Sequence, residues 1–278
     1  MTDRLDGKTA VVTGSSSGIG EGIAKRFAAE GANVVTNSRS LERAEATAEA
    51  IREEGGTAVA AEADVSEKAE VEALVDAAVE EFGSLDIMVN NAGIGHIAPA
   101  LEMPEDEWRR VIEVNLTGPF FGSQVAGQRM AEGGDGGQII NVSSIYGSIG
   151  VQGRAPYNAS KGGLNNLTRC LAVELAEYDV GVNALAPGFI KTALDEQTRE
   201  EMEGDGEEGE VDRSDRPWPR YGYEDQDIRD RVPVDRFGTV EEMANCATFL
   251  AEGGHYMTGE VMHADGGWLA FGWGSKGR

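Results

Sequence analysis

The stretch "TAVVTGSSSGIGEGIAKRFAAEG", residues 9–31, decides the fold class of this 278-residue chain. A short apolar run is followed by three glycines and then by an amphipathic segment; the glycines are Gly14, Gly18 and Gly20. Glycine permits a sharp turn and a close approach to a ligand, and the N-terminus of a helix presents free N–H groups to phosphate. The spacing G-x-x-x-G-x-G differs from the general dinucleotide fingerprint G-x-G-x-x-G. Even so, a strand, a glycine-rich turn and a helix in this order predict a nucleotide-binding unit.

The same alternation of short apolar runs and longer amphipathic segments continues along the chain. Seven strand candidates lie at 9–13, 33–37, 57–63, 85–90, 138–143, 181–186 and 260–264. Early helices are expected to end at glycines such as Gly55 and Gly83. A late helix opens at Thr239 with Glu242 three residues on, which fits a capping box. This pattern predicts one α/β domain over residues 1–278, a doubly wound parallel sheet of about seven strands with helices on both faces.

One segment interrupts this alternation. Residues 195–235 carry little apolar periodicity, several glycines and a heavy negative charge. The segment is too long for a simple connection between elements. We expect a mobile lid over a substrate site, with a solvated insertion of no catalytic relevance as the alternative.

The charge balance excludes several classes of partner. A formal charge of −25, from 49 acidic and 24 basic residues, argues against binding to nucleic acid or to an anionic membrane. Such self-repulsion is screened in molar salt, and the scarcity of lysine relative to arginine is typical of halophile proteins. No leader and no membrane-length apolar run is evident, so we expect a cytoplasmic protein. Cys170 and Cys246 stand outside any C-x-x-C and are expected to be reduced packing residues.

The end of the second strand candidate, "TNSRS", bears on the type of dinucleotide. In the general fold an acidic residue near this point binds the ribose 2′-hydroxyl, whereas an arginine accommodates a 2′-phosphate. Here Ser38 stands where the carboxylate is expected, and Arg39 follows it. Because a hydroxyl and a guanidinium can bind phosphate, we expect NADP(H). NAD(H) is the alternative if Arg39 is only a surface residue.

Five motifs occur together: "TGSSSGIG" at 13–20, "NNAG" at 90–93, "NVSS" at 141–144, "YNASK" at 157–161 and "PG" at 187–188. With them the chain resembles the short-chain dehydrogenases/reductases, and the likeness extends to "RFGTVEEMA" and "MTGEVMHADGGW" near the C-terminus. The resemblance implies a Rossmann fold and hydride transfer between a secondary alcohol, or a sugar hydroxyl, and a carbonyl. It implies a catalytic group of Asn115, Ser144, Tyr157 and Lys161.

The glycine turn, the "TNSRS" end and the resemblance together give a set of cofactor-binding residues. Asp64 and Val65 are expected by the adenine, and the residues after "PG" by the nicotinamide. The set is Gly14, Ser16, Ser17, Gly18, Ile19, Gly20, Ser38, Arg39, Asp64, Val65, Asn91, Ala92, Gly93, Tyr157, Lys161, Pro187, Gly188, Ile190 and Thr192.

The chemistry of the implied catalytic group is consistent with its residue types. Tyr157 and Lys161 are four apart, so on a helix they share one face. The pKa of tyrosine is about 10, and a nearby ammonium favours the phenolate, so Lys161 is the activator and Tyr157 the acid/base. The resemblance favours Ser144 over Ser143, because Ser144 lies thirteen residues before the tyrosine, the usual interval in the family. Its hydroxyl would hold the substrate oxygen. Asn115 is expected to support the lysine through a water.

The substrate is less defined. Candidate contacts come from the loops after "NNAG", after Ser144 and after "PG": His96, Ile145, Gln152, Phe189 and Leu194. No catalytic metal is expected, because none of the three histidines has metal-ligand spacing with another. One alternative is reduction of a 3-oxoacyl thioester, but an acidic carrier protein requires a basic docking face that this chain does not suggest. We therefore favour a small free substrate such as a sugar or polyol.

Two further expectations follow from the resemblance. A non-catalytic NADP(H)-binding redox sensor is the alternative from another class of function. Such a sensor is expected to lose the tyrosine or the lysine, and both are present here. The family assembles through helices and C-terminal segments, so we expect a homotetramer, with a dimer as the alternative.

Overall fold

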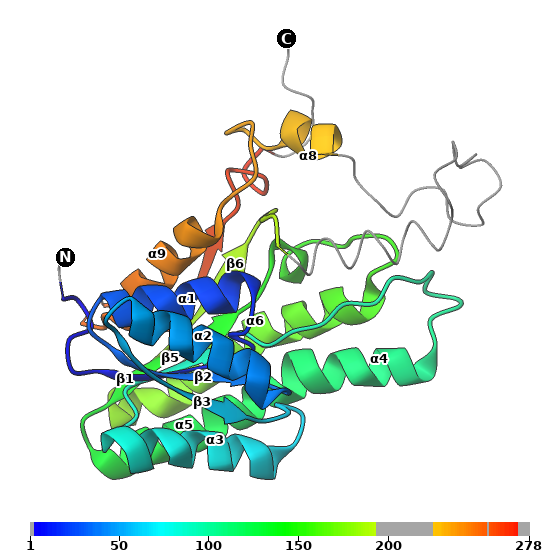
Figure 1. The fold of residues 1–278 in the computed structure, drawn as a ribbon. Coiled ribbons are helices and arrows are strands. Elements are labelled where there is room, and N and C mark those ends of the chain that lie inside the picture. Colours follow the sequence, from blue (N-terminus) through cyan, green and yellow to red (C-terminus); the bar gives the residue numbers. More distant parts are fainter. Residues whose placement is uncertain (1–2, 193–224, 255, 272–278) are drawn as a thin grey trace.

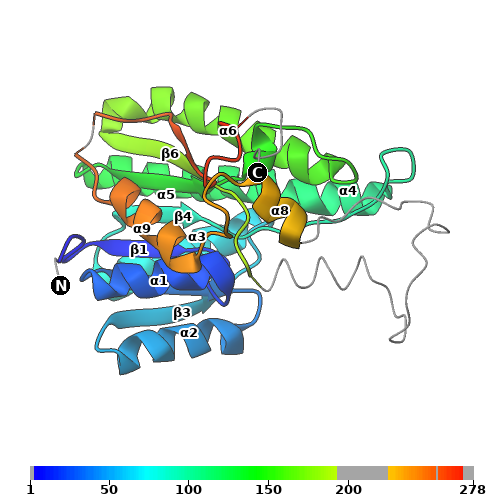
Figure 2. The ribbon, with the colours of Figure 1, turned by 90° about the horizontal axis from the view of Figure 1, so that it is seen from above.

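The computed structural model describes residues 3–192, 225–254 and 256–271. Leu194 and most of the acidic segment 195–235 lie outside the described residues. Two views of the ribbon show a central sheet between two layers of helices (Figures 1 and 2).

The sheet has seven parallel strands in the order β3-β2-β1-β4-β5-β6-β7, which confirms the predicted fold class (Figure 2). The strands are β1 Thr9–Val12, β2 Asn33–Ser38, β3 Thr57–Glu62, β4 Ile87–Asn90, β5 Gly137–Val142, β6 Val180–Pro187 and β7 Val261–Ala264. The order reverses between β1 and β4, each of which pairs with the other. In such sheets ligands bind outside the carboxyl ends of the strands at this switch point.

Helices cover both faces of the sheet. One layer contains α1 Gly18–Ala29, α2 Leu41–Glu53 and α9 Val240–Ala251; the other contains α3 Lys68–Phe82, α5 Gly118–Gly133 and α6 Ala155–Leu175 (Figure 1). Within β1, Ala10 and Val12 pack into the first layer and Val11 into the second. Because alternate side chains of a strand point to opposite faces, a strand buried on both faces must be apolar throughout. This requirement explains the unbroken run "TAVV".

Shorter elements complete the chain. They are α4 Glu105–Ile112, a π-helical turn Glu113–Thr117, the 3₁₀ turns Ile145–Gly147 and Ala176–Tyr178, and α8 Asp225–Arg231. Among the described residues no helix is long and apolar enough to cross a membrane.

The predicted helix ends are confirmed. Gly55 and Gly83 have φ angles of 86° and 85°, in the left-handed region that glycine enters without strain. At α9 the hydroxyl of Thr239 accepts the N–H of Glu242, and the Glu242 carboxylate accepts the N–H of Thr239.

The prediction that both cysteines are packing residues is wrong for Cys170. Both thiols are free, but Cys170 is exposed on the outer side of α6 and is not a packing residue. Cys246 is half-buried against the core beneath α9.

The described part of the acidic segment is not structureless. Ile228 of α8 and Val232 after it are buried, and they pack with Ile145, Phe237 and Trp268. Ile228 and the Val232 that follows the helix anchor α8 next to the loop that follows β5.

Candidate active site

The glycine turn after β1 has the geometry of a phosphate cradle. Gly14 and Gly18 have φ angles of 61° and 58°. A Cβ on Gly14 would lie 2.8 Å from the Cα of Ala92, and one on Gly20 would lie 2.3 Å from Nδ2 of Asn91. Ser17, the N-cap of α1, makes no side-chain capping bond, which leaves the first N–H groups of the helix available to an anion. The chain therefore fits the pyrophosphate of a dinucleotide at this turn.

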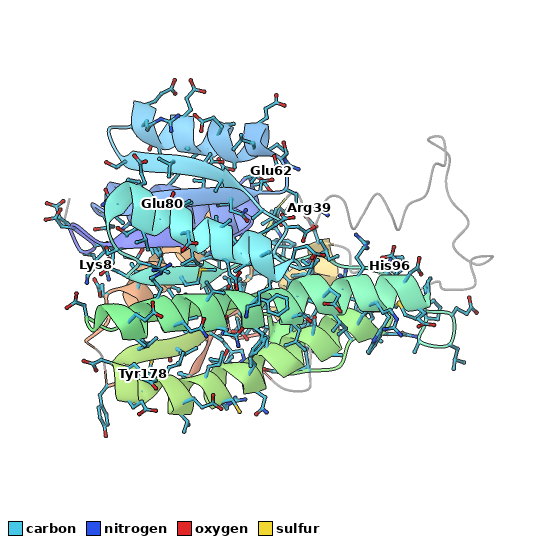
Figure 3. All side chains as sticks on the ribbon, turned by 90° about the horizontal axis from the view of Figure 1, so that it is seen from below. Lys8, Arg39, Glu62, Glu80, His96 and Tyr178 are labelled. Atoms are coloured by element: carbon cyan, nitrogen blue, oxygen red, sulfur yellow. The ribbon has the colours of Figure 1, made fainter. Side chains whose placement is uncertain are left out.

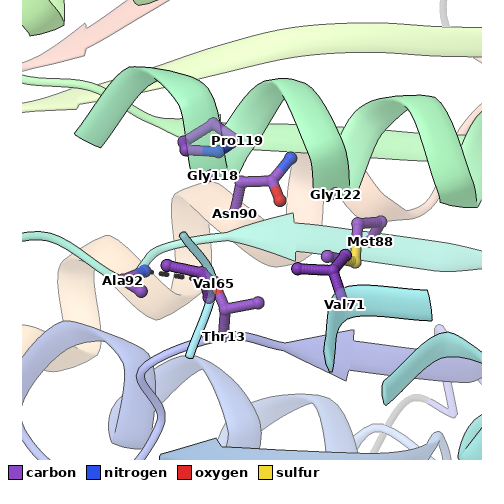
Figure 4. A pocket seen from close by; sticks show the side chains of 9 residues that line it. All are labelled: Thr13, Val65, Val71, Met88, Asn90, Ala92, Gly118, Pro119 and Gly122. Carbon is purple, nitrogen blue, oxygen red and sulfur yellow. Dashed lines mark hydrogen bonds between the residues drawn. The ribbon is translucent and has the colours of Figure 1, made fainter. Parts of the chain in front are cut away.

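The "NNAG" segment is fixed to the same turn. Nδ2 of Asn91 donates to the carbonyl oxygens of Thr13 at 2.9 Å and Gly14 at 3.0 Å. The N–H of Ala92 donates to the Thr13 hydroxyl at 3.1 Å (Figure 4). A small pocket adjoins this bond. Its lining residues are Thr13, Val65, Val71, Met88, Asn90, Ala92, Gly118, Pro119 and Gly122. The pocket lies at the switch point between β1 and β4.

The opposite side of the turn is closed by the segment after β6. A Cβ on Gly18 would lie 3.5 Å from Cβ of Thr192. The N–H of Gly188 donates to the carbonyl of Ala264, and Ile190 forms a bridge with Gly238. The segment from Pro187 to Thr192 therefore runs from the sheet to the N-terminus of α1, on whose turn Ser16, Ser17 and Ile19 also lie.

The adenine end combines a carboxylate and a guanidinium. Burial alone would raise the pKa of Asp64, but hydrogen bonds from Ser66 and the charge of Arg39 lower it below its usual value. The Ser66 hydroxyl and N–H reach the Asp64 carboxylate at 2.6 Å and 2.9 Å. Arg39 is exposed and makes no ion pair closer than 4.0 Å with any described residue. Its guanidinium is thus available beside the predicted ribose site.

Sequence reasoning missed Glu62 at this place. Glu62 ends β3 in register with Ser38 at the end of β2, and its carboxylate accepts the N–H of Leu41 at 3.1 Å (Figure 3). The carboxylate thus caps the N-terminus of α2. The signal in the sequence was the single acidic residue of "TAVAAEA". That Glu62 lies beside Ser38 becomes clear only from the register between β2 and β3.

Tyr157 and Lys161 lie in the first part of α6, as predicted. Nζ of Lys161 is 5.7 Å from the centre of the Tyr157 ring and donates to the carbonyl of Val142 at 2.8 Å. Lys161 is 3% exposed, and burial lowers its pKa to about 8. Desolvation disfavours the charged ammonium, which is the physical cause of this shift.

Ser143 and Ser144 differ in what they bind. The hydroxyl of Ser143 is directed to α6, where it lies 2.6 Å from Oδ1 of Asn165. Oγ of Ser144 accepts the N–H of Tyr146 at 3.1 Å and so caps the 3₁₀ turn. Because a hydroxyl that accepts one bond can still donate its own proton, Ser144 retains a donor.

Asn115 sits on the π-helical turn between α4 and α5 and is fully buried. Its amide forms two bonds of 2.8 Å with the backbone N–H and carbonyl of Ile94. A Cβ on Gly93 would lie 3.5 Å from Oδ1 of Asn115 and 3.6 Å from Nζ of Lys161, so the two groups flank the same point. Single π turns of this kind often occur at functional sites.

A buried polar network behind the site was also missed. Nδ2 of Asn90 donates to Oδ1 of Asn141 and to the hydroxyl of Ser123, and Asn141 in turn donates to Thr168. These bonds tie β4 and β5 to α5 and α6, which carry the site. An asparagine near the end of each of two adjacent apolar strands was the available signal.

Of the predicted substrate residues, Ile145 and Phe189 pack in one partly aromatic cluster with Tyr157. Ile145 is buried, Phe189 is half-buried and Gln152 is exposed. The rings of Tyr146 and Phe189 lie 6.2 Å apart. Nδ1 of His96 is 3.4 Å from the Glu107 carboxylate, at the start of α4 (Figure 3).

Metal ligation finds no support in the described part of the chain. There, no group of three or more His, Cys, Asp or Glu side chains is placed to hold a metal ion.

Comparisons with known proteins agree with the fold and with this geometry. The short chain dehydrogenase family profile matches residues 8–203. The chain is 40% identical to glucose 1-dehydrogenase 2 of Bacillus subtilis, with 96% of each chain covered. It is 41% identical to 3β-hydroxysteroid dehydrogenase 1 of Eggerthella lenta, covering 96% of this chain and 95% of the relative.

A solved structure extends the likeness to the whole fold. A gluconate 5-dehydrogenase from Burkholderia cenocepacia, in complex with NADP and tartrate, superposes with a TM-score of 0.84. The identity is 34%, and 97% of this chain and 98% of that chain are covered. Family profile, relatives and structure all name dehydrogenases, and this chain belongs to the short-chain dehydrogenase family of oxidoreductases.

Proposed function

We propose that this protein is an NADP(H)-dependent oxidoreductase that interconverts a secondary alcohol, or a sugar hydroxyl, and the corresponding carbonyl. The observation that carries the proposal is the buried Lys161 ammonium 5.7 Å from the Tyr157 ring. A nicotinamide cofactor, when bound, supplies or accepts the hydride. The glycine turn described above is its binding site in this proposal.

In this proposal Tyr157 moves the proton. Its phenol donates to the carbonyl oxygen in reduction and its phenolate accepts the hydroxyl proton in oxidation. The charge of Lys161 favours the phenolate, and because burial lowers the pKa of Lys161 to about 8, that help fades above this pH. Ser144 donates its remaining proton to the substrate oxygen and holds it during the transfer.

Asn115 acts without contacting the substrate. Its two bonds to Ile94 fix the loop that follows β4, and its Oδ1 lies beside the same point as Nζ of Lys161. A water bound there would receive hydrogen bonds from the lysine and donate one to the amide oxygen. In this role Asn115 keeps the ammonium hydrated on one side and leaves a proton route to solvent.

Two opposing features bear on the choice of cofactor. Ser38 and the available guanidinium of Arg39 support a 2′-phosphate, whereas the Glu62 carboxylate beside Ser38 opposes it. The Burkholderia structure is described with NADP, which supports the first assignment. NADP(H) is therefore the proposed cofactor, with NAD(H) as the second choice.

The proposed substrate is a small free molecule. The relatives named above act on a sugar, a hydroxysteroid and a sugar acid, so the reacting group is shared while the rest of the substrate differs. The net charge of −25 disfavours docking of an acidic carrier protein, which weakens the 3-oxoacyl thioester alternative. Retention of both Tyr157 and Lys161 disfavours the non-catalytic sensor.

The test is Tyr157→Phe, with Tyr178→Phe as the matched control. Tyr178 lies beyond the far end of α6 and is 44% exposed. Loss of the acid/base should reduce turnover by at least about a thousand-fold, near the upper end of general acid–base contributions. Binding of NADPH, followed by its fluorescence, should change less than about two-fold, since the phenol proton is not part of the phosphate cradle.

The control variant should keep wild-type turnover and wild-type NADPH affinity. Turnover by Tyr157→Phe close to that of Tyr178→Phe would refute the proposed mechanism. The assay panel comprises sugars, polyols, ketones and 3-oxoacyl-CoAs with each cofactor.

A homotetramer is the proposed assembly, with a dimer as the alternative. Phe120 on α5 and Val173 on α6 are 36% and 80% exposed, although both side chains are apolar. Burial of such side chains between copies removes apolar surface from water. Sedimentation in molar salt that shows only monomer would exclude both assemblies.

A further inference from the structure

A row of aromatic rings extends from the proposed catalytic tyrosine. The Tyr146 ring lies edge-on to Tyr157 at 6.3 Å and to Phe189 at 6.2 Å, and Phe189 contacts Trp268 at 4.7 Å. Tyr146, Phe189 and Trp268 belong to the cluster that α8 covers. We refer to these three residues as the aromatic row. The row forms one wall beside the reacting phenol.

Each end of the aromatic row carries a guanidinium. Cζ of Arg154 lies 5.7 Å from the centre of the Tyr146 ring, and Cζ of Arg231 lies 4.2 Å from that of Trp268. Most other Lys and Arg side chains in the described residues form an ion pair with a carboxylate. Lys191, for example, lies over Phe237 at 5.0 Å but also pairs with Asp225 at 2.8 Å.

Neither arginine forms such a pair. Within the described ranges, no carboxylate lies within 4.0 Å of the guanidinium of Arg154 or of Arg231. The Asp265 carboxylate, three residues before Trp268, accepts the N–H groups of Gly267 and Leu269.

A guanidinium held near a ring by the cation–π attraction uses none of its N–H donors for that contact. Those donors can therefore bind two oxygens of one anion. The net charge of the chain is −25, so carboxylates far outnumber the cations that could pair with them. The long-range field repels an anion, so anion binding at this place depends on such local cations.

Arg154 is close to the reacting group along the chain. It is the N-cap of α6, three residues before Tyr157. The N–H of Ala98 donates to the carbonyl of Gly153 at 3.0 Å, so the loop after β4 closes against the residue that precedes Arg154. Arg154 therefore stands where the loops that carry His96 and Gln152 meet.

We propose that Arg154 binds an oxyanion of the substrate, a carboxylate or a phosphate, several carbon atoms from the carbon that is oxidised or reduced. The substrate is then a hydroxy acid, such as a sugar acid, or a sugar phosphate, rather than a neutral alcohol. This inference rests on the proposed function, since it concerns the remainder of the substrate at the same site.

The experiment measures binding, so it does not depend on turnover. The wild-type protein is titrated calorimetrically, in the presence of NADPH, with sodium gluconate, with gluconamide, with sorbitol 6-phosphate and with sorbitol. Gluconamide and sorbitol are the neutral counterparts of the two anions. The same titrations are made with Arg154→Gln, Arg231→Gln and Arg169→Gln.

Arg169→Gln is the matched control, because Arg169 is an exposed arginine on α6 that also lacks a carboxylate partner among the described residues. At least one anion should bind the wild-type protein about 10-fold to 100-fold more tightly than its neutral counterpart, as charged hydrogen bonds allow. Arg154→Gln should abolish this preference, whereas Arg169→Gln should retain it, and so should Arg231→Gln, because Arg231 stands at the other end of the aromatic row.

The outcome separates this inference from the proposed function. Equal binding of both anions and their neutral counterparts overturns the inference, and so does a preference that survives in Arg154→Gln. Neither result bears on Tyr157, whose role is decided by the turnover of Tyr157→Phe. A preference for gluconate identifies the oxyanion as a carboxylate, and a preference for sorbitol 6-phosphate identifies it as a phosphate.

Discussion

At the scale of single residues, Lys161 shows what a sequence motif can predict and what it cannot. The spacing in "YNASK" predicts that Tyr157 and Lys161 share a helix face, and α6 places them so. The spacing does not predict that Lys161 is 3% exposed or that its ammonium donates to the Val142 carbonyl. Lys161 is buried because three parts of the chain come together around it: β5, α6 and the loop after β4. The shifted pKa of the lysine is therefore a property of the fold.

The pKa of Lys161 makes a prediction about stability. Unfolding returns its pKa from about 8 to the ordinary lysine value of 10.5. Below pH 8 the lysine is charged in both states, but between these values it is neutral when folded and protonated when unfolded. The unfolded state then binds more protons, so the free energy of unfolding contributed by Lys161 rises with pH. With about 1.4 kcal/mol for each pKa unit, the rise is up to about 3 kcal/mol.

The measurement compares urea unfolding of the wild-type protein with that of Lys161→Met across this pH window. The difference in unfolding free energy between them should rise in favour of the wild type from pH 8 upward. Lys68→Met serves as the control, because Lys68 is an exposed lysine in a helix. A flat difference for Lys161→Met would contradict the shifted pKa.

The two serines after β5 show what a motif leaves undecided. Ser143 and Ser144 both follow an apolar run, and the interval to Tyr157 is the argument for Ser144. In the structure Ser143 is engaged with Asn165, and Ser144 keeps a donor beside the loop. The direction of each hydroxyl follows from the turn at Ile145–Gly147, which no sequence periodicity encodes.

At the scale of elements, the strands were predictable and α8 was not. The central strands are buried on both faces, so their apolar runs are continuous and stand out against their neighbours. In contrast, α8 contributes Ile228 and is followed by Val232, within a run of charged residues. Two apolar side chains give too weak a period to distinguish a short helix from a loop. Their burial depends on Trp268, which is distant in the sequence.

The ends of β2 and β3 carry a prediction about cofactor choice. The carboxylate of Glu62, which caps α2, lies next to Ser38 in the sheet. Glu62→Gln removes this negative charge while its side-chain oxygen can still accept the N–H of Leu41. Affinity for NADP should rise by about 3-fold to 10-fold, and affinity for NAD should change by less than about 2-fold, because only NADP carries the 2′-phosphate.

Arg39→Gln is the counterpart of this variant. It should weaken NADP binding by about 10-fold and leave NAD binding unchanged, with both affinities followed through the fluorescence of the reduced cofactor. NAD is the internal control, because it tests the glycine turn without the extra phosphate. Equal effects on the two cofactors would place the 2′-phosphate away from Arg39 and Glu62.

At the scale of the whole molecule, charge is the dominant feature that the sequence shows without a structure. The described ion pairs place cations on carboxylates, such as Lys25 on Glu21 and Arg52 on Glu45. With 49 acidic against 24 basic residues, a large surplus of carboxylates still remains. Sequence composition predicts this surplus, but only the structure shows that Arg154 and Arg231 stand on aromatic rings instead.

The surplus charge predicts that salt stabilises the folded protein. Repulsion between exposed carboxylates extends over about 10 Å in about 0.1 M salt and over about 3 Å in about 1 M salt. Since each kcal/mol of relieved repulsion raises the Tm by about 2–4 °C in a chain of this size, we expect a rise of at least about 5 °C between about 0.05 M and about 1 M KCl. Sucrose at matched osmolality separates screening from exclusion of the solute.

The C-terminal half of α2 provides a local version of this test. Glu49, Glu53 and Glu54 are exposed there, and their charges repel one another and the negative end of the helix dipole. Replacing all three with glutamine should raise the Tm in low salt and reduce its dependence on KCl. Replacing all three with aspartate keeps the charges and should leave the salt dependence as it is. The same salt dependence in both triple variants would show that screening of surface carboxylates is not the source of the stabilisation.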